Sequence, residues 1–174
     1  DATVILKTAS SYQRLVEEIS IFLHRSKESF SADGQKLFSA ERDLSLQGKK
    51  ILIVDDDIRN VYALSAILED EGLELLTALN GKEAIDLLKK QEDINLVLMD
   101  VMMPVMDGYE ALAIIRQNDA WKNLPVITVT AKAQRGDREA ALSAGANDYI
   151  SKPIDHEQLL LLIKLWINHS TKEA

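Results

Sequence analysis

Acidic side chains follow two short apolar runs in this sequence. Residues 96–99 are all apolar and lead into Asp100, and the apolar run 51–54 leads into aspartates at positions 55–57. Short apolar runs bounded by turn residues are typical of strands buried on both faces of a parallel sheet. Ligands of such sheets bind beyond the carboxyl ends of the strands. The aspartates are therefore candidates for one shared site.

Carboxylates that converge in one pocket repel each other unless a cation joins them. Oxygen ligands without His or Cys favour Mg²⁺ or Mn²⁺, which keep several waters and can also bind a phosphoryl oxygen. A second interpretation of Asp55, Asp56 and Asp57 stays open, because acidic residues also stabilise the first turn of an ordinary helix. We expect Asp57 to serve as a helix cap.

Two further strand ends carry polar groups. Thr130 precedes the small residue Ala131, and Lys152 precedes Pro153, which fixes the turn. A hydroxyl, an ammonium group and a metal ion around one carboxylate are the groups that stabilise transfer of a phosphoryl group onto a nucleophile. The sequence therefore predicts that Asp100 is a nucleophile for phosphoryl transfer.

The segments between these residues predict how they are positioned. Short apolar runs alternate with amphipathic helical segments from residue 49 onward, which predicts an α/β fold with a doubly wound, five-stranded parallel sheet and helices on both faces. The predicted strands are 50–54, 74–78, 95–99, 125–129 and 148–150, and the predicted helices are 59–71, 82–91, 109–117, 135–143 and 155–168.

The segment MDVMMPVMDG, residues 99–108, together with the polar strand ends, resembles the response-regulator receiver family over residues 49 to about 169. The resemblance implies a flavodoxin-like sheet with strand order 2-1-3-4-5. It matches the family's acidic pair to Asp55 and Asp56, and its phosphoacceptor aspartate to Asp100. The family's hydroxyl residue matches Thr130, its lysine before proline matches Lys152, and its aromatic switch position falls on Tyr149.

By the same resemblance, Mg²⁺ would be held by Asp56, Asp100 and the backbone carbonyl of Met102, with Asp55 acting through water. Met102 and Lys132 would occupy the variable positions that tune the lifetime of the phosphoryl group. A phosphohistidine on a histidine kinase or a histidine phosphotransfer protein would be the donor in a His-Asp phosphorelay.

Phosphorylation would then draw Thr130 toward the phosphoryl group and turn Tyr149 inward. The surface of the fourth helix, fifth strand and fifth helix would change as a result. The fragment would thus be a phosphoacceptor that assists its own phosphorylation and dephosphorylation.

Two other functions stay open. A haloacid-dehalogenase-like phosphatase also uses an aspartate nucleophile at a strand end, but it needs a second Asp two residues later, where this chain has Met102. An interaction module that is never phosphorylated would be expected to lack the acidic pair or Lys152, and this sequence has both.

The first 48 residues are organised differently. Residues 1–25 hold a strand-like start and an amphipathic helix that echo the segment around Tyr149 to Lys152 and the last helix, either by coincidence or as the end of an upstream receiver-like module. We interpret residues 26–48 as a linker and 49–170 as the receiver domain. This order resembles the C-terminal end of a hybrid sensor histidine kinase with tandem receivers.

Composition excludes several classes of protein. Residues 1–48 hold 7 acidic and 6 basic residues and residues 49–174 hold 21 and 14, so we expect no direct binding to nucleic acid. Cysteine is absent, which excludes thiolate metal sites and fits a reducing compartment. No apolar run reaches the roughly 18 residues of a membrane span, so we expect a cytoplasmic domain without direct membrane contact, even if the parent protein is membrane-anchored.

The last predicted helix has more apolar residues than one buried face holds. If Leu159, Ile163, Trp166 and Ile167 face the sheet, then Leu161 and Leu165 either form an exposed pair for a dimer or intramolecular contact, or flank the core at the helix edges. We expect surface roles for the three histidines, His24, His156 and His169, because their spacing supports no metal site.

Overall fold

The computed structural model describes residues 46–131 and 135–170. In this part of the chain five parallel strands form one sheet in the order β2-β1-β3-β4-β5, which confirms the predicted α/β fold and strand order. The strands are β1 (Lys50–Val54), β2 (Glu74–Ala78), β3 (Leu96–Asp100), β4 (Val126–Thr130) and β5 (Asp148–Ser151). The strand and helix predicted within 1–25, the linker up to residue 45, and Lys132 lie outside the described residues.

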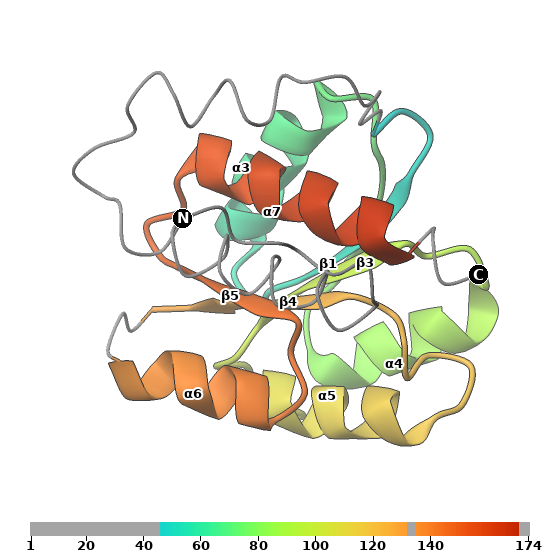
Figure 1. Cartoon of the computed structure of the whole chain (residues 1–174), viewed down its shortest axis with the longest axis vertical. Helices are drawn as coiled ribbons and strands as arrows, with labels where there is room; N and C mark the ends of the chain where they lie inside the picture. The colour runs from blue at the N-terminus through green and yellow to red at the C-terminus, as the bar shows by residue number, and fades with distance from the viewer. Residues whose placement is uncertain (1–45, 132–134, 171–174) are drawn as a thin grey trace, which may run out of the picture. The chain divides into compact units, whose positions relative to one another are not determined.

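Helices cover both faces of the sheet, as expected for right-handed crossovers between parallel strands. Figure 1 shows α3 and α7 on one face and α4, α5 and α6 on the other. Their bounds are α3 (Ile58–Glu69), α4 (Gly81–Lys90), α5 (Gly108–Gln117), α6 (Arg135–Ser143) and α7 (His156–Ser170). No helix in the described ranges has the length and apolar content that crossing a bilayer requires.

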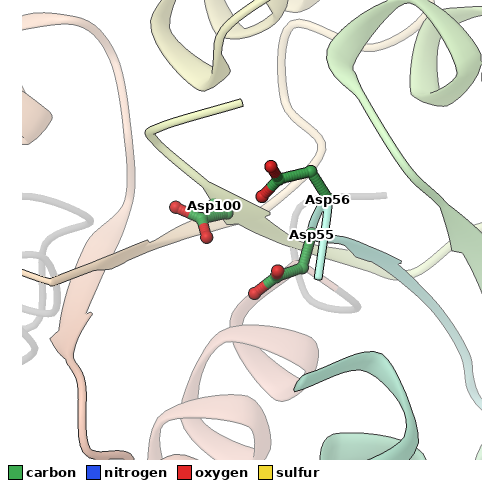
Figure 2. A group of neighbouring side chains, drawn as sticks. All are labelled: Asp55, Asp56 and Asp100. Carbon is green, nitrogen blue, oxygen red and sulfur yellow. The ribbon is translucent and has the colours of Figure 1, made fainter. Parts of the chain in front are cut away.

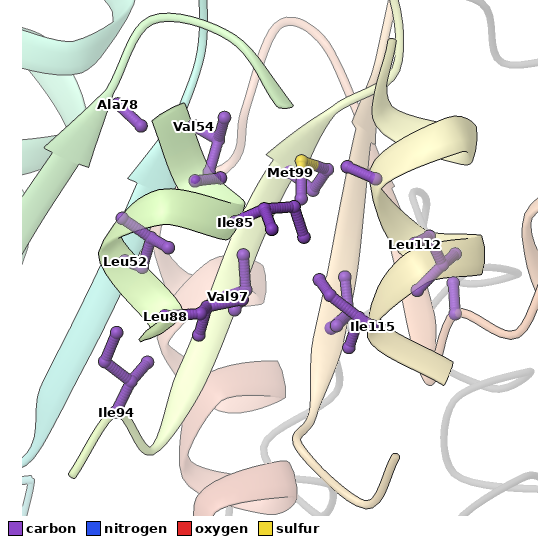
Figure 3. Packing of buried hydrophobic residues seen from close by; sticks show 14 of the residues in the cluster. Leu52, Val54, Ala78, Ile85, Leu88, Ile94, Val97, Met99, Leu112 and Ile115 are labelled. Carbon is purple, nitrogen blue, oxygen red and sulfur yellow. The ribbon is translucent and has the colours of Figure 1, made fainter. Parts of the chain in front are cut away.

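The central strands are buried along their whole length. Every residue of β3 and β4 is buried, which explains why these strands are nearly continuous apolar runs rather than alternating ones. On the face covered by α4 and α5, side chains of β1 and β3 such as Leu52, Val97 and Met99 pack against helix residues such as Ile85 and Leu112 (Figure 3). Packing on this face holds β1 and β3 in register, so the two strands end at the same edge of the sheet.

The strand ends lie one residue further along the chain than predicted for β3, β4 and β5. Val101 N–H donates to Val129 O at 3.1 Å, so the ladder between β3 and β4 continues past Met99. Asp100 and Thr130 are consequently the last residues of their strands, not the first residues of loops. Their backbones are held by sheet hydrogen bonds, which leaves less freedom than a loop would.

Side chains that cap helices define where the helices begin after the strands. Asp57 is the N-cap of α3 and accepts from Arg59 N–H at 3.0 Å, which confirms its expected role as a cap. Asp107 and Glu110 form a capping box at the start of α5. Each of these helices starts a few residues after β1 or β3, so both point their N-terminal ends toward the same edge of the sheet.

The apolar residues of helix α7 differ in how deeply they are buried. Leu159, Leu162, Ile163 and Ile167 are fully or almost fully buried, so Leu162 takes the place that the sequence assigned to Trp166. Trp166 is partly buried, and its indole N–H donates to Asp148 Oδ2 at 3.3 Å.

Leu161 and Leu165 are also partly buried rather than exposed. The four core residues span about 140° of the helix circumference, and both leucines lie outside that arc. A dimer or intramolecular contact through this pair stays a prediction.

Candidate functional site

The carboxyl ends of β1 and β3 bring the predicted acidic residues together. The two strands are neighbours, with Val54 opposite Met99, so the residues that follow meet at one edge of the sheet. Carboxylate oxygens of Asp55, Asp56 and Asp100 lie within 4.8 Å of one another (Figure 2). Asp55 and Asp100 are 2% and 5% exposed, whereas Asp56 is open to solvent.

Lys152 reaches this cluster from the end of β5, which lies two strands away from β3 in the sheet. It follows β5, and its backbone N–H donates to Thr130 O at 2.7 Å, which anchors the turn. Its Nζ lies 2.5 Å from Asp100 Oδ2 and 2.8 Å from Asp55 Oδ2. The lysine predicted from the fifth strand end is thus in direct contact with both buried carboxylates.

Thr130 and Tyr149 occupy neighbouring strands beside the cluster. Val129 lies opposite Asp100 in the ladder, and Thr130 is the next residue along β4, with its side chain largely buried. Tyr149 lies on β5 opposite Thr128 and is partly buried against the core. Thr130 is therefore on the strand next to β3, which carries the phosphoacceptor candidate. Tyr149 is one strand further out, on the side from which Lys152 comes.

Burial and hydrogen bonding oppose each other at the two central groups. Burial raises the pKa of Asp100, and hydrogen bonds from Lys152 and from the Met102 N–H counteract this only in part. Burial lowers the pKa of Lys152, but its hydrogen bonds to Asp100 and Asp55 outweigh that effect, so its pKa is raised. One ammonium group faces two buried carboxylates and a third exposed one, which leaves an excess of negative charge for a cation to neutralise.

The carboxylates differ in how many protein donors they already accept. Asp55 accepts from Asp57 N–H, from Lys152 Nζ and from the Asn60 amide, which bonds to both of its oxygens. Asp100 accepts one donor on each oxygen, the Met102 N–H at 3.0 Å and the lysine. Among the described residues nothing donates to Asp56 or to the carbonyl of Met102.

Free oxygen lone pairs are therefore concentrated on Asp56, Asp100 and the Met102 carbonyl. All of these ligand atoms are hard oxygens, and no His or Cys takes part, so the residues present fit Mg²⁺ or Mn²⁺. In the described part of the chain, this is also the only group of three or more His, Cys, Asp or Glu side chains close enough to hold one ion.

Among the described residues, the side chains of the remaining candidates make no hydrogen bond or ion pair with the cluster. Asp57 turns its carboxylate to Arg59, with a shortest contact of 2.6 Å to Nη2, and hydrogen bonds from Arg59 hold the pKa of Asp57 at about 2. His156 is exposed at the start of α7, as expected for a surface residue. The Met102 side chain is 75% exposed beside the site, which agrees with a position that can vary.

Sequence reasoning missed the roles of two residues near the cluster. Asn60 donates to Asp55 from the first turn of α3, and no sequence pattern pointed to it. Gly108 belongs to the segment 99–108, but the sequence pattern alone gives no physical reason for a glycine at this position. A Cβ atom on Gly108 would lie 2.2 Å from the carbonyl oxygen of Asp100, so any side chain there would displace the backbone of the central aspartate.

Comparisons with known proteins agree with this geometry. The family model described as response regulator receiver domain matches residues 51–164. The sensor protein GacS of Pseudomonas syringae is 37% identical over 126 residues, which span 71% of this chain but only 14% of that protein. Protein PilH of Pseudomonas aeruginosa is 40% identical over 114 residues, which cover 66% of this chain and 93% of PilH.

Solved structures extend the likeness to the site. The receiver domain of the sensor histidine kinase PA1611 from Pseudomonas aeruginosa aligns with a TM-score of 0.65 at 36% identity, and the match covers 70% of this chain and 98% of that domain. That structure has a magnesium ion coordinated in its active site cleft. Receiver domains thus bind Mg²⁺ in an acidic pocket of the kind seen here. With its fold, its cluster of acidic residues and these relatives taken together, the chain belongs to the response regulator receiver family of two-component signalling.

Proposed function

We propose that this domain accepts a phosphoryl group on Asp100 from a phosphohistidine, with Mg²⁺ bound, and passes the signal on through a change of surface. The observation that supports this most strongly is the placement of Lys152 Nζ at 2.5 Å from Asp100 Oδ2, beside the acidic pair. A carboxylate, an ammonium group and a cation-binding pocket are the parts that phosphoryl transfer to aspartate needs.

In the proposed reaction a carboxylate oxygen of Asp100 attacks phosphorus in line with the bond to the imidazole nitrogen. The new P–O bond forms an acyl phosphate, the P–N bond breaks, and the imidazole leaves with its electron pair. Mg²⁺, held by Asp56, Asp100 and the Met102 carbonyl, would neutralise charge on the phosphoryl oxygens. Mn²⁺ would be an alternative with the same ligands.

The residues of the chain have separate roles in this proposal. Lys152 binds a phosphoryl oxygen and shields the attacking carboxylate from Asp55. Thr130 donates its hydroxyl to another phosphoryl oxygen, and Tyr149 then fills the space that Thr130 leaves. Since Tyr149 lies on β5 between α6 and α7 in the chain, the surface of α6, β5 and α7 would report the phosphorylated state.

The larger context of the domain is also a proposal. Two of the relatives named above are sensor proteins, GacS and the kinase PA1611, and the matched region is only 14% of GacS. We propose that this chain is the C-terminal part of a hybrid histidine kinase, with a cytoplasmic location, and that its phosphodonor is a kinase domain in cis or in trans. A histidine phosphotransfer protein is a further candidate partner, and the acidic composition of residues 49–174 argues against direct binding to nucleic acid.

Incubation with acetyl phosphate and Mg²⁺, followed by intact-mass spectrometry, tests the proposed function. The wild-type protein should gain one phosphoryl group, and Asp100→Asn should gain none. If the wild type gains nothing, a non-phosphorylated interaction module becomes the better account. Steady turnover of a phosphomonoester would favour the phosphatase alternative instead, despite Met102 at the position where that class needs an acid.

A further inference from the structure

Asn60 places its side-chain amide against the buried carboxylate of Asp55. It is the third residue of α3, five positions after Asp55, and is partly buried. Its Nδ2 lies 3.2 Å from Asp55 Oδ1 and 3.1 Å from Asp55 Oδ2. One amide therefore spans both oxygens of the carboxylate and restrains rotation of the carboxylate about its own axis.

The other donors to Asp55 complete its hydrogen bonding. Asp57 N–H donates to Oδ1 at 2.8 Å, and Lys152 Nζ donates to Oδ2 at 2.8 Å. A carboxylate accepts about four hydrogen bonds in all. Because the Asn60 amide contacts both oxygens in addition to these two donors, Asp55 has little capacity left for a direct bond to a cation.

This arrangement separates two aspartates that the sequence places side by side. Asp55 is committed to protein donors, and the neighbouring Asp56 accepts none among the described residues. We infer that Asn60 is a positioning residue: it fixes the carboxylate of Asp55 so that Asp55 holds Lys152 against Asp100, while Asp56 is left for the cation. The inference rests on the proposed function of the site.

The energetic reason is competition for one ammonium group. Lys152 bridges Asp55 and Asp100, so a carboxylate free to rotate at Asp55 would shift the ammonium away from Asp100. The same rotation would move Asp55 out of position to bind a water ligand of the cation, which would weaken Mg²⁺ binding. Partners that orient the ligands of a metal site typically change metal affinity by roughly 10- to 100-fold when removed. Asn60 acts one step further out, through Asp55, so we expect an effect near the lower end of that range.

Two substitutions separate hydrogen bonding from packing. Asn60→Leu keeps the size of the side chain without its donor, and Asn60→Ala removes the side chain while favouring the helix. A matched control is Asn95→Ala, because Asn95 Oδ1 accepts from Lys50 N–H at 2.8 Å at the opposite edge of the sheet, away from the acidic cluster. The control removes one partly buried hydrogen bond without touching the site.

The first measurement uses the metal-free protein. Exchange of the Lys152 ammonium protons with solvent, followed by NMR with nitrogen-15 in the lysine side chains, should be faster in both Asn60 variants than in the wild type and in Asn95→Ala. The second is Mg²⁺ titration by calorimetry, in which both Asn60 variants should bind roughly tenfold more weakly. A purely structural role of Asn60 would lower stability and leave both quantities unchanged in the folded protein.

The outcomes distinguish this inference from the proposed function. Unchanged ammonium exchange in Asn60→Leu and Asn60→Ala would overturn the role of Asn60, whatever the wild type does with a phosphodonor. The same conclusion follows if Asn60→Ala loses Mg²⁺ affinity and Asn60→Leu keeps it, since packing would then be the cause. A wild type that takes up no phosphoryl group would overturn the proposed function, and the exchange data would still decide whether Asn60 holds Asp55 and Lys152 in place.

Discussion

Lys152 Nζ lies 2.5 Å from Asp100 Oδ2, although the two residues are 52 positions apart in the chain. Both residues are at strand ends, so the sheet itself creates the contact. In water a salt bridge between such groups contributes little, but here the carboxylate is almost fully buried, so removal of Lys152 leaves Asp100 without its counter-charge at a high cost in free energy.

Lys152→Met should separate phosphoryl transfer from metal binding. Without the ammonium group, the rate of phosphorylation by acetyl phosphate should fall by about a hundredfold, the usual cost of removing one donor that stabilises transition-state charge. Mg²⁺ affinity should stay the same or rise, because a competing positive charge is gone. Lys50→Met, which removes a contact with Asp93 away from the site, should leave both quantities unchanged. An unaltered rate in Lys152→Met would contradict the role given to the lysine.

Two of the three successive aspartates, Asp56 and Asp57, should respond differently to neutralisation. Asp56→Asn should weaken Mg²⁺ binding by at least about tenfold, since Asp56 is the exposed carboxylate with free lone pairs. Asp57→Asn should change Mg²⁺ affinity little, because that carboxylate caps α3 and pairs with Arg59. Calorimetric titration of both variants measures this contrast. An equal loss of Mg²⁺ affinity in the two variants would contradict the assignment of Asp56, rather than Asp57, as a ligand of the cation.

Gly108→Ala should damage the site through the backbone. The added methyl group would lie 2.2 Å from the Asp100 carbonyl oxygen, so either α5 or the end of β3 must shift. Overpacking of this kind costs about 1–3 kcal/mol of the free energy of unfolding, which urea denaturation measures. Phosphorylation of the remaining folded protein should also slow, because the central carboxylate moves with its backbone.

Gly48→Ala provides the comparison for that experiment. Gly48 has a positive φ of 71°, but a Cβ there would meet no atom within 4 Å. Its substitution should therefore cost only backbone strain and leave the phosphorylation rate at the wild-type value. If Gly108→Ala behaves like Gly48→Ala in both assays, the contact with Asp100 has no functional consequence.

Thr130→Ala should uncouple phosphorylation from the change at the surface. In the wild type, beryllofluoride with Mg²⁺ should alter hydrogen exchange in α6, β5 and α7, the elements around Tyr149. In Thr130→Ala the ligand should still bind, but the change in exchange over these elements should be largely lost, because no hydroxyl is drawn toward the site. The same response in variant and wild type would argue against Thr130 as the link to Tyr149.

The fold was predictable because the central strands have a clear sequence pattern. Runs such as 96–99 are apolar throughout, and the residues that follow are polar, so the sequence alone places Asp55, Asp100, Thr130 and Lys152 at one edge of a parallel sheet. Strand ends were predicted one residue early in three cases, since the ladder hydrogen bonds that define the last residue depend on the neighbouring strand.

Contacts that depend on three-dimensional packing were not predictable in this way. An asparagine in a helix has many roles, and only the turn from β1 into α3 brings the Asn60 amide back to Asp55. The same holds for α7, where the choice between Leu162 and Trp166 for the core is made by the surface of the sheet beneath it. Periodicity alone gives the face of a helix to within about one residue.

The central claim is that Asp100 carries the phosphoryl group, and chemical mapping of the modified residue tests it most directly. Borohydride reduces an aspartyl phosphate to homoserine, which mass spectrometry of the digested protein locates. After treatment with acetyl phosphate and Mg²⁺, we expect homoserine at position 100, and we expect none when EDTA replaces Mg²⁺. Homoserine at Asp55 or Asp56, or a phosphoryl group on His156, would contradict the claim.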